Sequence, residues 1–307
     1  MLQDVLSGFL KTPKELPPKY FYDERGAELF DAICDTPEYY PTRAEASILE
    51  QHAVDIIALS GADTLVELGS GAARKTRMLL DALAATTESP VFAPIDISGE
   101  MLIRSSRALL DDYPTLRIDG AIADYDAGIT VVPRAGKRLI AFLGSTIGNF
   151  RQPDAVAFFR AMAETMDAAD HVLIGFDLAK PAGVLNAAYN DAAGVTAEFN
   201  LNVLRVLNRV LDADFDVAQF VHHARYHEAA GQIEMYLESR QAQRVRIGAL
   251  NKQFEFGAGE RIRTEISRKF TRPQINAMFS GAGLAERHWY QDSEGRFALV
   301  VAGLDSL

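Results

Sequence analysis

Three carboxylate side chains stand at or just beyond the ends of consecutive apolar segments. Glu67 lies in TLVEL (64–68), Asp96 ends VFAPID (91–96), and Asp124 lies in GAIADY (120–125). If these segments are neighbouring parallel strands, their carboxyl ends meet at the edge of the sheet where open α/β sheets bind ligands. Carboxylates accept hydrogen bonds from hydroxyl and amino groups. The three acids therefore predict a site for a ligand that carries such groups.

A glycine-rich turn follows the first of these segments. In VELGSGAARKT (66–76), Gly69 permits a tight turn, and Gly71 lets the backbone approach a ligand because it has no Cβ. A dinucleotide-binding turn requires a third glycine where this sequence has Arg74. The turn matches instead the E/D-x-G-x-G pattern of proteins that bind S-adenosylmethionine. We therefore expect Glu67 to orient the turn or the ammonium group of this cofactor.

The two later acids fit the rest of the same cofactor. Asp96 is placed to accept from both ribose hydroxyls, and Asp124 from the adenine amino group, with Tyr125 near the ring. Any one aspartate at a strand end could equally cap a helix or form a turn. Three strand ends that carry the expected groups in order favour an adenosyl-sulfonium cofactor.

Apolar strands and helices alternate through the middle of the chain. Several strands are continuous apolar runs, which is typical of parallel strands covered by helices on both faces. The last segment, GLAERHWYQDSEGRFALVVAGL (283–304), predicts an antiparallel hairpin that turns near 293–295. The fold class is therefore α/β, a Rossmann-like class I methyltransferase with a seven-stranded sheet.

A second, smaller α+β substrate-binding domain is expected from the change of pattern in the second half of the chain. Residues 182–212 have helical spacing, and 232–247 and 261–270 alternate like antiparallel strands. The predicted boundaries are 44–196 and 270–307 for the S-adenosylmethionine-dependent domain, and 1–43 and 197–269 for the substrate-binding or capping domain.

The N-terminal region has weaker patterns. Residues 1–20 are expected to form a loosely ordered arm, and 22–35 to form a helix with Leu29, Phe30 and Ile33 on one stripe. Thr42 and Glu45 match the T-x-x-E capping box at the start of a longer helix.

Composition excludes several partners. The net charge is −11 and no Lys/Arg cluster persists, which argues against binding a nucleic acid. No apolar run is long enough to span a membrane, and the N-terminus has no signal-peptide pattern. The single cysteine, Cys34, cannot form an internal disulfide, which fits a reducing cytoplasm. We expect a cytoplasmic monomer that acts on a small molecule, without a nucleic-acid or membrane partner.

Longer motifs identify a family. No N/D-P-P-Y/F motif follows the fourth strand; FLGSTIGNF (142–150) stands there, with Asn149 either at the mouth of a cleft or holding the loop. Together with YFYDERGAELFDAI, PEYYPTRAE, YNDAAGVTAEFNLNVL and TEISRKF, the chain resembles the histidine Nα-methyltransferases of ergothioneine biosynthesis from about residue 20 to its end. The resemblance implies three successive methyl transfers from S-adenosylmethionine to the α-amino nitrogen of L-histidine, giving hercynine, without a metal.

The resemblance also assigns residues. Cofactor positions are Gly69, Lys75, Asp96, Asp124 and Tyr125, to which the turn analysis adds Glu67 and Gly71. Asn149 and Tyr189 fall on positions that hold the carboxylate and amino end of the substrate, and Met235 on one that lines the side-chain pocket. The positions around the imidazole are Tyr39, Glu265 and Ser267, and the position close to the amine is Tyr22. The candidate catalytic residues are Tyr22 and Tyr39. Of the adjacent Tyr39 and Tyr40, we expect Tyr39 to lie in the pocket. The departures are the AAR segment of the glycine turn and Tyr125, where an aromatic residue is expected.

Glu265 and Ser267 are two apart in a predicted strand and should share a face. The same face is expected to carry Arg263 and Lys269, and these four polar residues alone would indicate an edge of the sheet that is exposed to solvent. With the resemblance, Glu265 accepts from one imidazole N–H and Ser267 bonds the other nitrogen. Three alternatives remain: the same methylation of tryptophan, a cofactor-binding protein without activity, and a dehydrogenase. An indole has one donor and no acceptor for the pair, and the missing third glycine disfavours a dehydrogenase. No dedicated base is assigned; proton loss to solvent or to a tyrosine is expected.

Overall fold

The computed structural model describes residues 1–124 and 136–305 and divides into two units. Unit 1 comprises Met1–Tyr40 and Lys180–Arg268, and unit 2 comprises Pro41–Ala179 and Lys269–Leu307. The expected boundary at residue 197 differs from the observed one at Lys180. The reason is packing, because Leu185 and Ala188 are buried in the core of unit 1.

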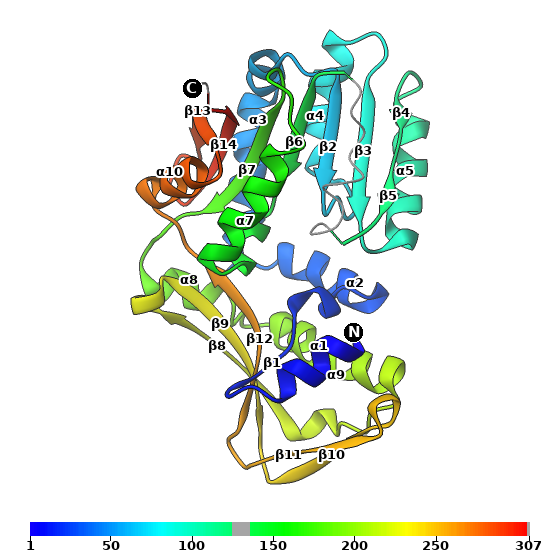
Figure 1. Ribbon diagram of the computed structural model, residues 1–307, viewed down its shortest axis with the longest axis vertical. Coiled ribbons are helices and arrows are strands. Elements are labelled where there is room, and N and C mark those ends of the chain that lie inside the picture. The colour runs from blue at the N-terminus through cyan, green and yellow to red at the C-terminus, as the bar shows by residue number, and fades with distance from the viewer. Residues whose placement is uncertain (125–135, 306–307) are drawn as a thin grey trace. The chain divides into compact units, whose positions relative to one another are not determined.

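Unit 2 contains a mostly parallel sheet (Figure 1). Its strand order is β13-β14-β7-β6-β2-β3-β4, and β5 also pairs with β3. The antiparallel members are β13 and β14, which form the predicted C-terminal hairpin. The strands are β2 (Thr64–Leu68), β3 (Val91–Asp96), β4 (Arg117–Ile118), β5 (Ala121–Ile122), β6 (Arg138–Phe142), β7 (His171–Asp177), β13 (Leu284–Gln291) and β14 (Phe297–Leu304).

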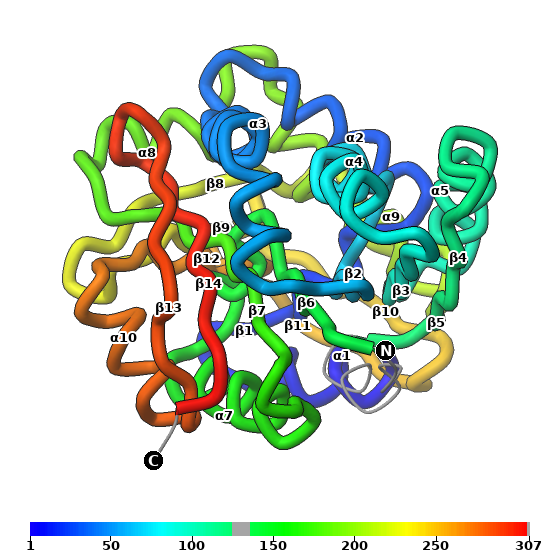
Figure 2. The backbone as a smooth tube through the Cα atoms, turned by 90° about the horizontal axis from the view of Figure 1, so that it is seen from above, coloured from blue at the N-terminus to red at the C-terminus, as the bar shows by residue number. Residues whose placement is uncertain are grey.

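Helices cover both faces of this sheet (Figure 2). Helices α3 (Tyr40–Ser60), α4 (Thr76–Thr86) and α5 (Gly99–Asp112) share one apolar core with Leu65 of β2. Helices α7 (Gln152–Ala163) and α10 (Arg272–Gly281) share the other with Val66 and Leu68. Since neighbouring residues of β2 enter opposite cores, all five of its residues are buried, as the continuous apolar run predicts.

Unit 1 is an α+β unit around a four-stranded sheet in the order β1-β12-β9-β8, with β10 and β11 forming a separate hairpin. Its strands are β1 (Lys14–Glu15), β8 (Phe220–His227), β9 (Gln232–Ser239), β10 (Gln243–Ile247), β11 (Lys252–Phe256) and β12 (Arg261–Arg268). Its helices are α1 (Leu2–Phe9), α2 (Glu24–Cys34), α8 (Ala182–Ala188) and α9 (Val195–Leu211). Short 3-10 helices are η1 (Pro18–Phe21), η4 (Val217–Gln219), η5 (Glu228–Ala230) and η6 (Gly248–Leu250) in this unit, and η3 (Thr146–Asn149) in unit 2.

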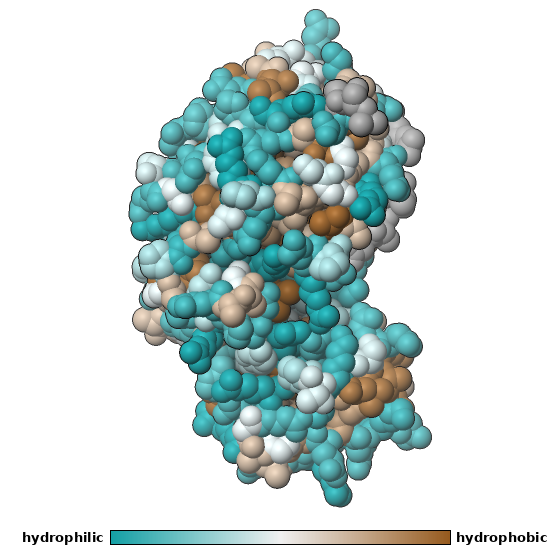
Figure 3. Space-filling view, turned by 60° about the vertical axis from the view of Figure 1, so that its left-hand side comes forward, coloured by the Kyte–Doolittle hydropathy of each residue, from teal (hydrophilic) through white to brown (hydrophobic). Residues whose placement is uncertain are grey.

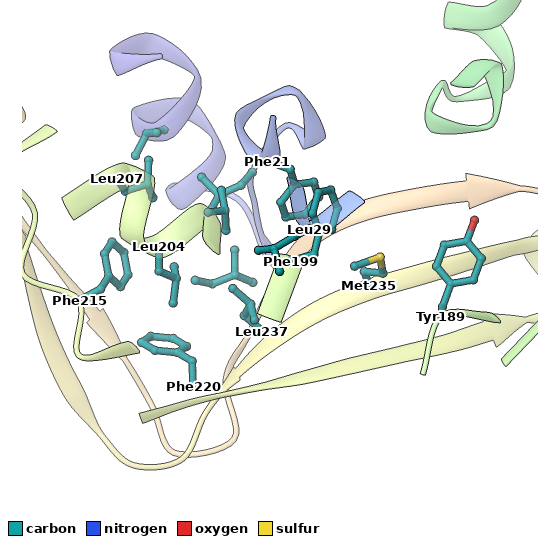
Figure 4. Close-up of a cluster of buried hydrophobic side chains, with 14 of the residues drawn as sticks. Phe21, Leu29, Tyr189, Phe199, Leu204, Leu207, Phe215, Phe220, Met235 and Leu237 are labelled. Carbon is teal, nitrogen blue, oxygen red and sulfur yellow. The ribbon is translucent and has the colours of Figure 1, made fainter. Parts of the chain in front are cut away.

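One apolar core joins the N-terminal segment, α9 and the inner face of the sheet (Figure 4). Val5 and Phe9 of α1 are buried in it, so the expectation of a loosely ordered arm over residues 1–20 is wrong. Val5 and Phe9 are four residues apart, a helical spacing that puts both side chains on one face of α1. Tyr189 and Met235 lie at one end of this core, away from Phe215 (Figure 4).

The molecular surface in Figure 3 is mostly hydrophilic, in keeping with a composition of 24% charged residues. Among the helices of the described residues, none is both long and apolar enough to cross a membrane.

Candidate active site

The glycine turn of unit 2 lies against the end of the neighbouring strand. The backbone N–H of Gly71 donates to Asp96 Oδ2 over 2.9 Å, and the N–H of Ser98 donates to Asp96 Oδ1 over 2.8 Å. Asp96 therefore holds the turn, and each of its oxygens has a further lone pair for a ligand hydroxyl. Gly69 and Gly71 have φ of +72° and +49°, and a Cβ added at either would meet nothing within 4 Å. The turn thus presents bare backbone to open space, as a close-approaching ligand requires.

Glu67 is buried at the end of β2 and accepts a hydrogen bond from Thr76 Oγ1 over 2.6 Å. This contact ties the strand to the first residue of α4 and so fixes the turn between them. Burial raises the pKa of Glu67 to about 8, although Thr76 and Lys75 act in the opposite direction. A cationic group bound beside this carboxyl group would favour its ionised form.

Lys75 forms an ion pair with Glu45, whose side chain is fully buried on α3. The Glu45 carboxylate also accepts from the backbone N–H of Gly144, over 2.8 Å to Oε1 and 3.0 Å to Oε2. The predicted capping box is wrong because α3 begins at Tyr40, which puts Thr42 inside its first turn. Sequence analysis missed the role of Glu45, although its spacing of three and four from the buried Ile48 and Leu49 puts it on the inward stripe of the helix.

The remaining strand-end residues of unit 2 lie in the expected places along the chain. Asp124 follows β5 and is half-buried, and the preceding Ala123 N–H donates to the backbone oxygen of Asp96 over 3.1 Å. Tyr125 lies outside the described residues. Asn149 ends η3 and is half-buried; the residue that precedes η3 is Ser145, whose Oγ accepts from the N–H of Asp177 over 2.9 Å. Asn149 is therefore carried by a segment anchored to the end of β7.

A break in the alternation of β12 decides which side chains of unit 1 share a face. Arg263 is opposite Tyr236 of β9, but Glu265 is opposite Met235, because the register shifts between them. Residues directly opposite in an antiparallel pair share a face, so Glu265 lies with the buried Met235 and Arg263 lies on the other side. The expected four-residue face is therefore wrong.

The cationic residues of that expected face have other partners. Arg263 pairs with Glu15, and Lys269 belongs to unit 2, where its ammonium group makes a buried ion pair of 2.8 Å with Asp177. Glu265 and Ser267, two apart beyond the shift, do share a face, as predicted.

Ser267 and Tyr189 meet in the interior of unit 1. The side chains are 6% and 7% exposed, and Tyr189 Oη donates to Ser267 Oγ over 2.8 Å. Tyr189 follows directly after α8, and Ser267 is near the end of β12. The two residues are remote in the sequence, so the pairing could not be read from local spacing.

Aromatic rings line the same region. Tyr39 lies 6.3 Å from Tyr189 and 6.2 Å from Phe30 between ring centroids, and Tyr22 lies 5.6 Å from both Phe30 and Phe199. Burial raises the pKa of the Tyr39 phenol well above its usual range, and the neighbouring Tyr189, Cys34, Tyr22 and Glu265 raise it further.

The neighbouring tyrosine is engaged elsewhere. Tyr40 Oη accepts from Lys180 Nζ over 2.8 Å. Tyr39, rather than Tyr40, thus joins the other predicted residues of unit 1.

Within residues 1–124 and 136–305, no group of three or more His, Cys, Asp or Glu side chains is arranged to hold a metal ion. The groups that this arrangement does offer are carboxylates, hydroxyls and bare backbone at the strand ends of unit 2, and a carboxylate, a hydroxyl pair and aromatic rings in unit 1.

Comparison with known proteins agrees with these features. The family model described as histidine-specific methyltransferase, SAM-dependent, matches residues 1–304. The chain is 46% identical to a histidine N-alpha-methyltransferase of Mycolicibacterium smegmatis, over 98% of this chain and 94% of that protein. It is 32% identical to ergothioneine biosynthesis protein 1 of Neurospora crassa, over 89% of this chain and 31% of that protein. It is 29% identical to the L-tryptophan methyltransferase trpM of Psilocybe serbica, over 96% of this chain and 90% of that protein.

Proposed function

The chain belongs to the SAM-dependent histidine-specific methyltransferases, and on this premise we propose that it methylates the α-amino group of L-histidine. S-adenosylmethionine is the methyl donor, and three successive transfers give hercynine, a step of ergothioneine biosynthesis. The observation that carries the proposal is the match over nearly the whole chain, together with the hydroxyl pair and carboxylate on one buried face of unit 1.

Unit 2 fits the donor by the chemistry of its strand ends. Asp96 would accept from the ribose hydroxyls and Asp124 from the adenine amino group, while the open space beside Gly69 and Gly71 would admit the cofactor against the backbone. Ser70 supports this, because its Oγ is buried in the turn without a hydrogen-bond partner among the described residues. A ligand at the turn would satisfy that hydroxyl. Lys75 and Glu67 would orient the amino-acid end of the cofactor.

Unit 1 would bind the imidazole of the substrate. Glu265 would accept a hydrogen bond from one ring N–H. Since Ser267 Oγ accepts from Tyr189, Ser267 would act toward the ring as a donor, to the nitrogen that carries no proton. Such a pair discriminates strongly, because an analogue without the ring nitrogens leaves buried polar groups unpaired. Met235, directly opposite Glu265, would close the pocket on its apolar side. Asn149 would bind the substrate carboxylate.

The transfer requires little covalent chemistry from the protein. The sulfonium supplies an activated methyl group with a neutral leaving group, and alignment of reacting atoms contributes up to roughly 7–11 kcal/mol in intramolecular reactions. Because its pKa is so high, the Tyr39 phenol stays protonated and is a poor proton acceptor for the substrate ammonium group. We therefore propose that the amine loses its proton to solvent or to a tyrosine other than Tyr39, with Tyr22 as the candidate. The rings of Tyr22 and Tyr39 would favour the methylated cation through cation–π attraction.

The runner-up substrate is tryptophan, which the similarity to trpM keeps open. Its indole N–H could donate to Glu265, but the ring has no acceptor for Ser267. Incubation of the purified protein with S-adenosylmethionine and each of the twenty amino acids, followed by mass analysis, separates the two. We expect trimethylated histidine as the main product. Methylation of tryptophan in preference to histidine would refute the proposal.

We further propose that the enzyme is a cytoplasmic monomer without a nucleic-acid or membrane partner. The single cysteine and the net charge of −11 support this. Light scattering on the eluting protein should give one chain's mass, 33.7 kDa, and a doubled mass would contradict it.

A further inference from the structure

A fully buried amide lies beneath the proposed imidazole site. Asn200 is in the first half of α9 and is 0% exposed. Its Oδ1 accepts from Thr264 Oγ1 over 2.7 Å, and its Nδ2 donates to the backbone oxygen of Tyr236 over 3.0 Å and contacts His222 Nδ1 over 2.8 Å. An asparagine in a core is costly unless its groups are paired, and here both ends of the amide are used.

The partners of His222 fix its tautomer. Its Nε2 lies 2.9 Å from the backbone oxygen of Tyr189, which can only accept. The proton of the neutral ring therefore sits on Nε2, and Nδ1 accepts from the Asn200 amide. Burial lowers the pKa of His222, which keeps the ring neutral. The chain of contacts runs without interruption from Asn200 through His222 to the backbone of Tyr189.

The amide oxygen of Asn200 contacts β12 at its register shift. Thr264 is the residue at the register shift, and its Oγ1 lies 2.7 Å from Asn200 Oδ1 and 3.2 Å from the backbone oxygen of Met235. The shift is what turns Glu265 toward the buried face, opposite Met235. Without the shift, unbroken alternation would put Arg263, Glu265 and Ser267 together.

We propose that Asn200 is the positioning residue that sets the distance between the two halves of the imidazole site. One arm fixes Glu265 through Thr264, and the other fixes Tyr189, whose hydroxyl holds Ser267, through His222. This inference rests on the proposed function. It means that Asn200 contributes to the preference for an imidazole ring, with its two nitrogens, without contacting the substrate. A purely structural amide would support stability and all substrates equally.

Four variants test the assignment. Asn200→Asp keeps the side chain's size but sets an oxygen against the Tyr236 carbonyl, and Thr264→Val replaces the hydroxyl with a methyl group of similar size. Thr264→Ser retains that hydroxyl and serves as the rescue. The matched control is Asn208→Asp, on the same helix, where both ends of the Asn208 amide are also used, in two hydrogen bonds of 2.8 Å to the backbone of Phe215.

The measurements are the KM for histidine, the KM for S-adenosylmethionine and the thermal midpoint of each variant. We expect Asn200→Asp and Thr264→Val to raise the histidine KM about tenfold, as the loss of a buried hydrogen bond implies. The KM for S-adenosylmethionine should stay near wild type, and Thr264→Ser and Asn208→Asp should keep the wild-type histidine KM.

Two outcomes would overturn the assignment. One is an unchanged histidine KM in both Asn200→Asp and Thr264→Val; the other is a rise in both KM values together, which a general structural role would cause. Failure of the proposed function is separate, because it would appear as absence of methylated histidine with the wild-type enzyme.

Discussion

Replacing Glu265 is the most direct test of the proposed recognition of the substrate imidazole. Glu265 lies on the buried face of β12, and its carboxylate would accept a hydrogen bond from the imidazole of histidine. Glu265→Ala removes this acceptor and leaves the cofactor residues of unit 2 untouched. A hydrogen bond to a charged group contributes about 1.5–3 kcal/mol, which corresponds to about 10- to 150-fold in kcat/KM for histidine.

The assay measures kcat/KM for histidine and, by calorimetry, the affinity for S-adenosylmethionine. A matched control is Glu234→Gln, because Glu234 is on the neighbouring strand opposite Ile266 and therefore on the other face of the sheet. We expect Glu265→Ala to lose histidine turnover with near wild-type cofactor affinity, and Glu234→Gln to retain both. Undiminished histidine turnover in Glu265→Ala, or an equal loss in Glu234→Gln, would refute the reasoning.

Three further changes act on unit 2. Gly71→Ala puts a Cβ on backbone with φ of +49° and into the open space of the turn, so it should lower both the stability of the protein and its affinity for the cofactor. The control is Gly61→Ala, also at positive φ (+57°) with open space around it, which should lower stability by the backbone strain of about 1–2 kcal/mol and leave cofactor affinity unchanged. Equal cofactor affinities of the two variants, measured by calorimetry, would contradict the role of the turn. Glu45→Ala removes a fully buried carboxylate and leaves the Lys75 ammonium and the Gly144 N–H without it, so urea unfolding should show a loss of about 3–5 kcal/mol, whereas Glu45→Gln, which keeps an acceptor for Gly144, should lose less. Glu67 has a pKa raised from 4.5 to about 8, so the folded state holds a proton that the unfolded state releases, and this group's contribution to stability is present below pH 4.5 and falls as pH rises toward 8. Glu67→Gln should therefore flatten the fall of unfolding free energy between pH 5 and pH 8, and parallel pH curves for variant and wild type would show that the carboxyl group does not titrate in this way.

Much of the fold and of the cofactor site was predictable from short segments of the sequence. The glycine turn, the acids at consecutive strand ends and the C-terminal hairpin are each encoded within a few residues, and parallel strands bring their ends to one edge whatever the rest of the protein does. The long motifs indicate the family without any knowledge of tertiary contacts, and the match over residues 1–304 agrees with them.

Contacts between residues remote in the sequence were not predictable in the same way. The capping box at Thr42 and Glu45 was read from spacing alone, but Glu45 is buried against Gly144, 99 positions away. The first twenty residues were expected to form a loosely ordered arm, yet the core of unit 1 holds Val5 and Phe9. In both cases the outcome depended on burial against residues remote in the sequence, which local spacing does not show.

The imidazole site shows the same division most clearly. The sequence by itself determined that Glu265 and Ser267 are two apart in a strand. It could not determine where the alternation breaks, because a register shift depends on the partner strand and on what packs against the shifted residue, here Asn200 against Thr264. Tertiary structure alone put Arg263 on the opposite face and joined Tyr189 to Ser267. A side chain's face follows from local geometry only while the strand is regular, and the irregularity is stabilised by hydrogen bonds from elsewhere in the chain.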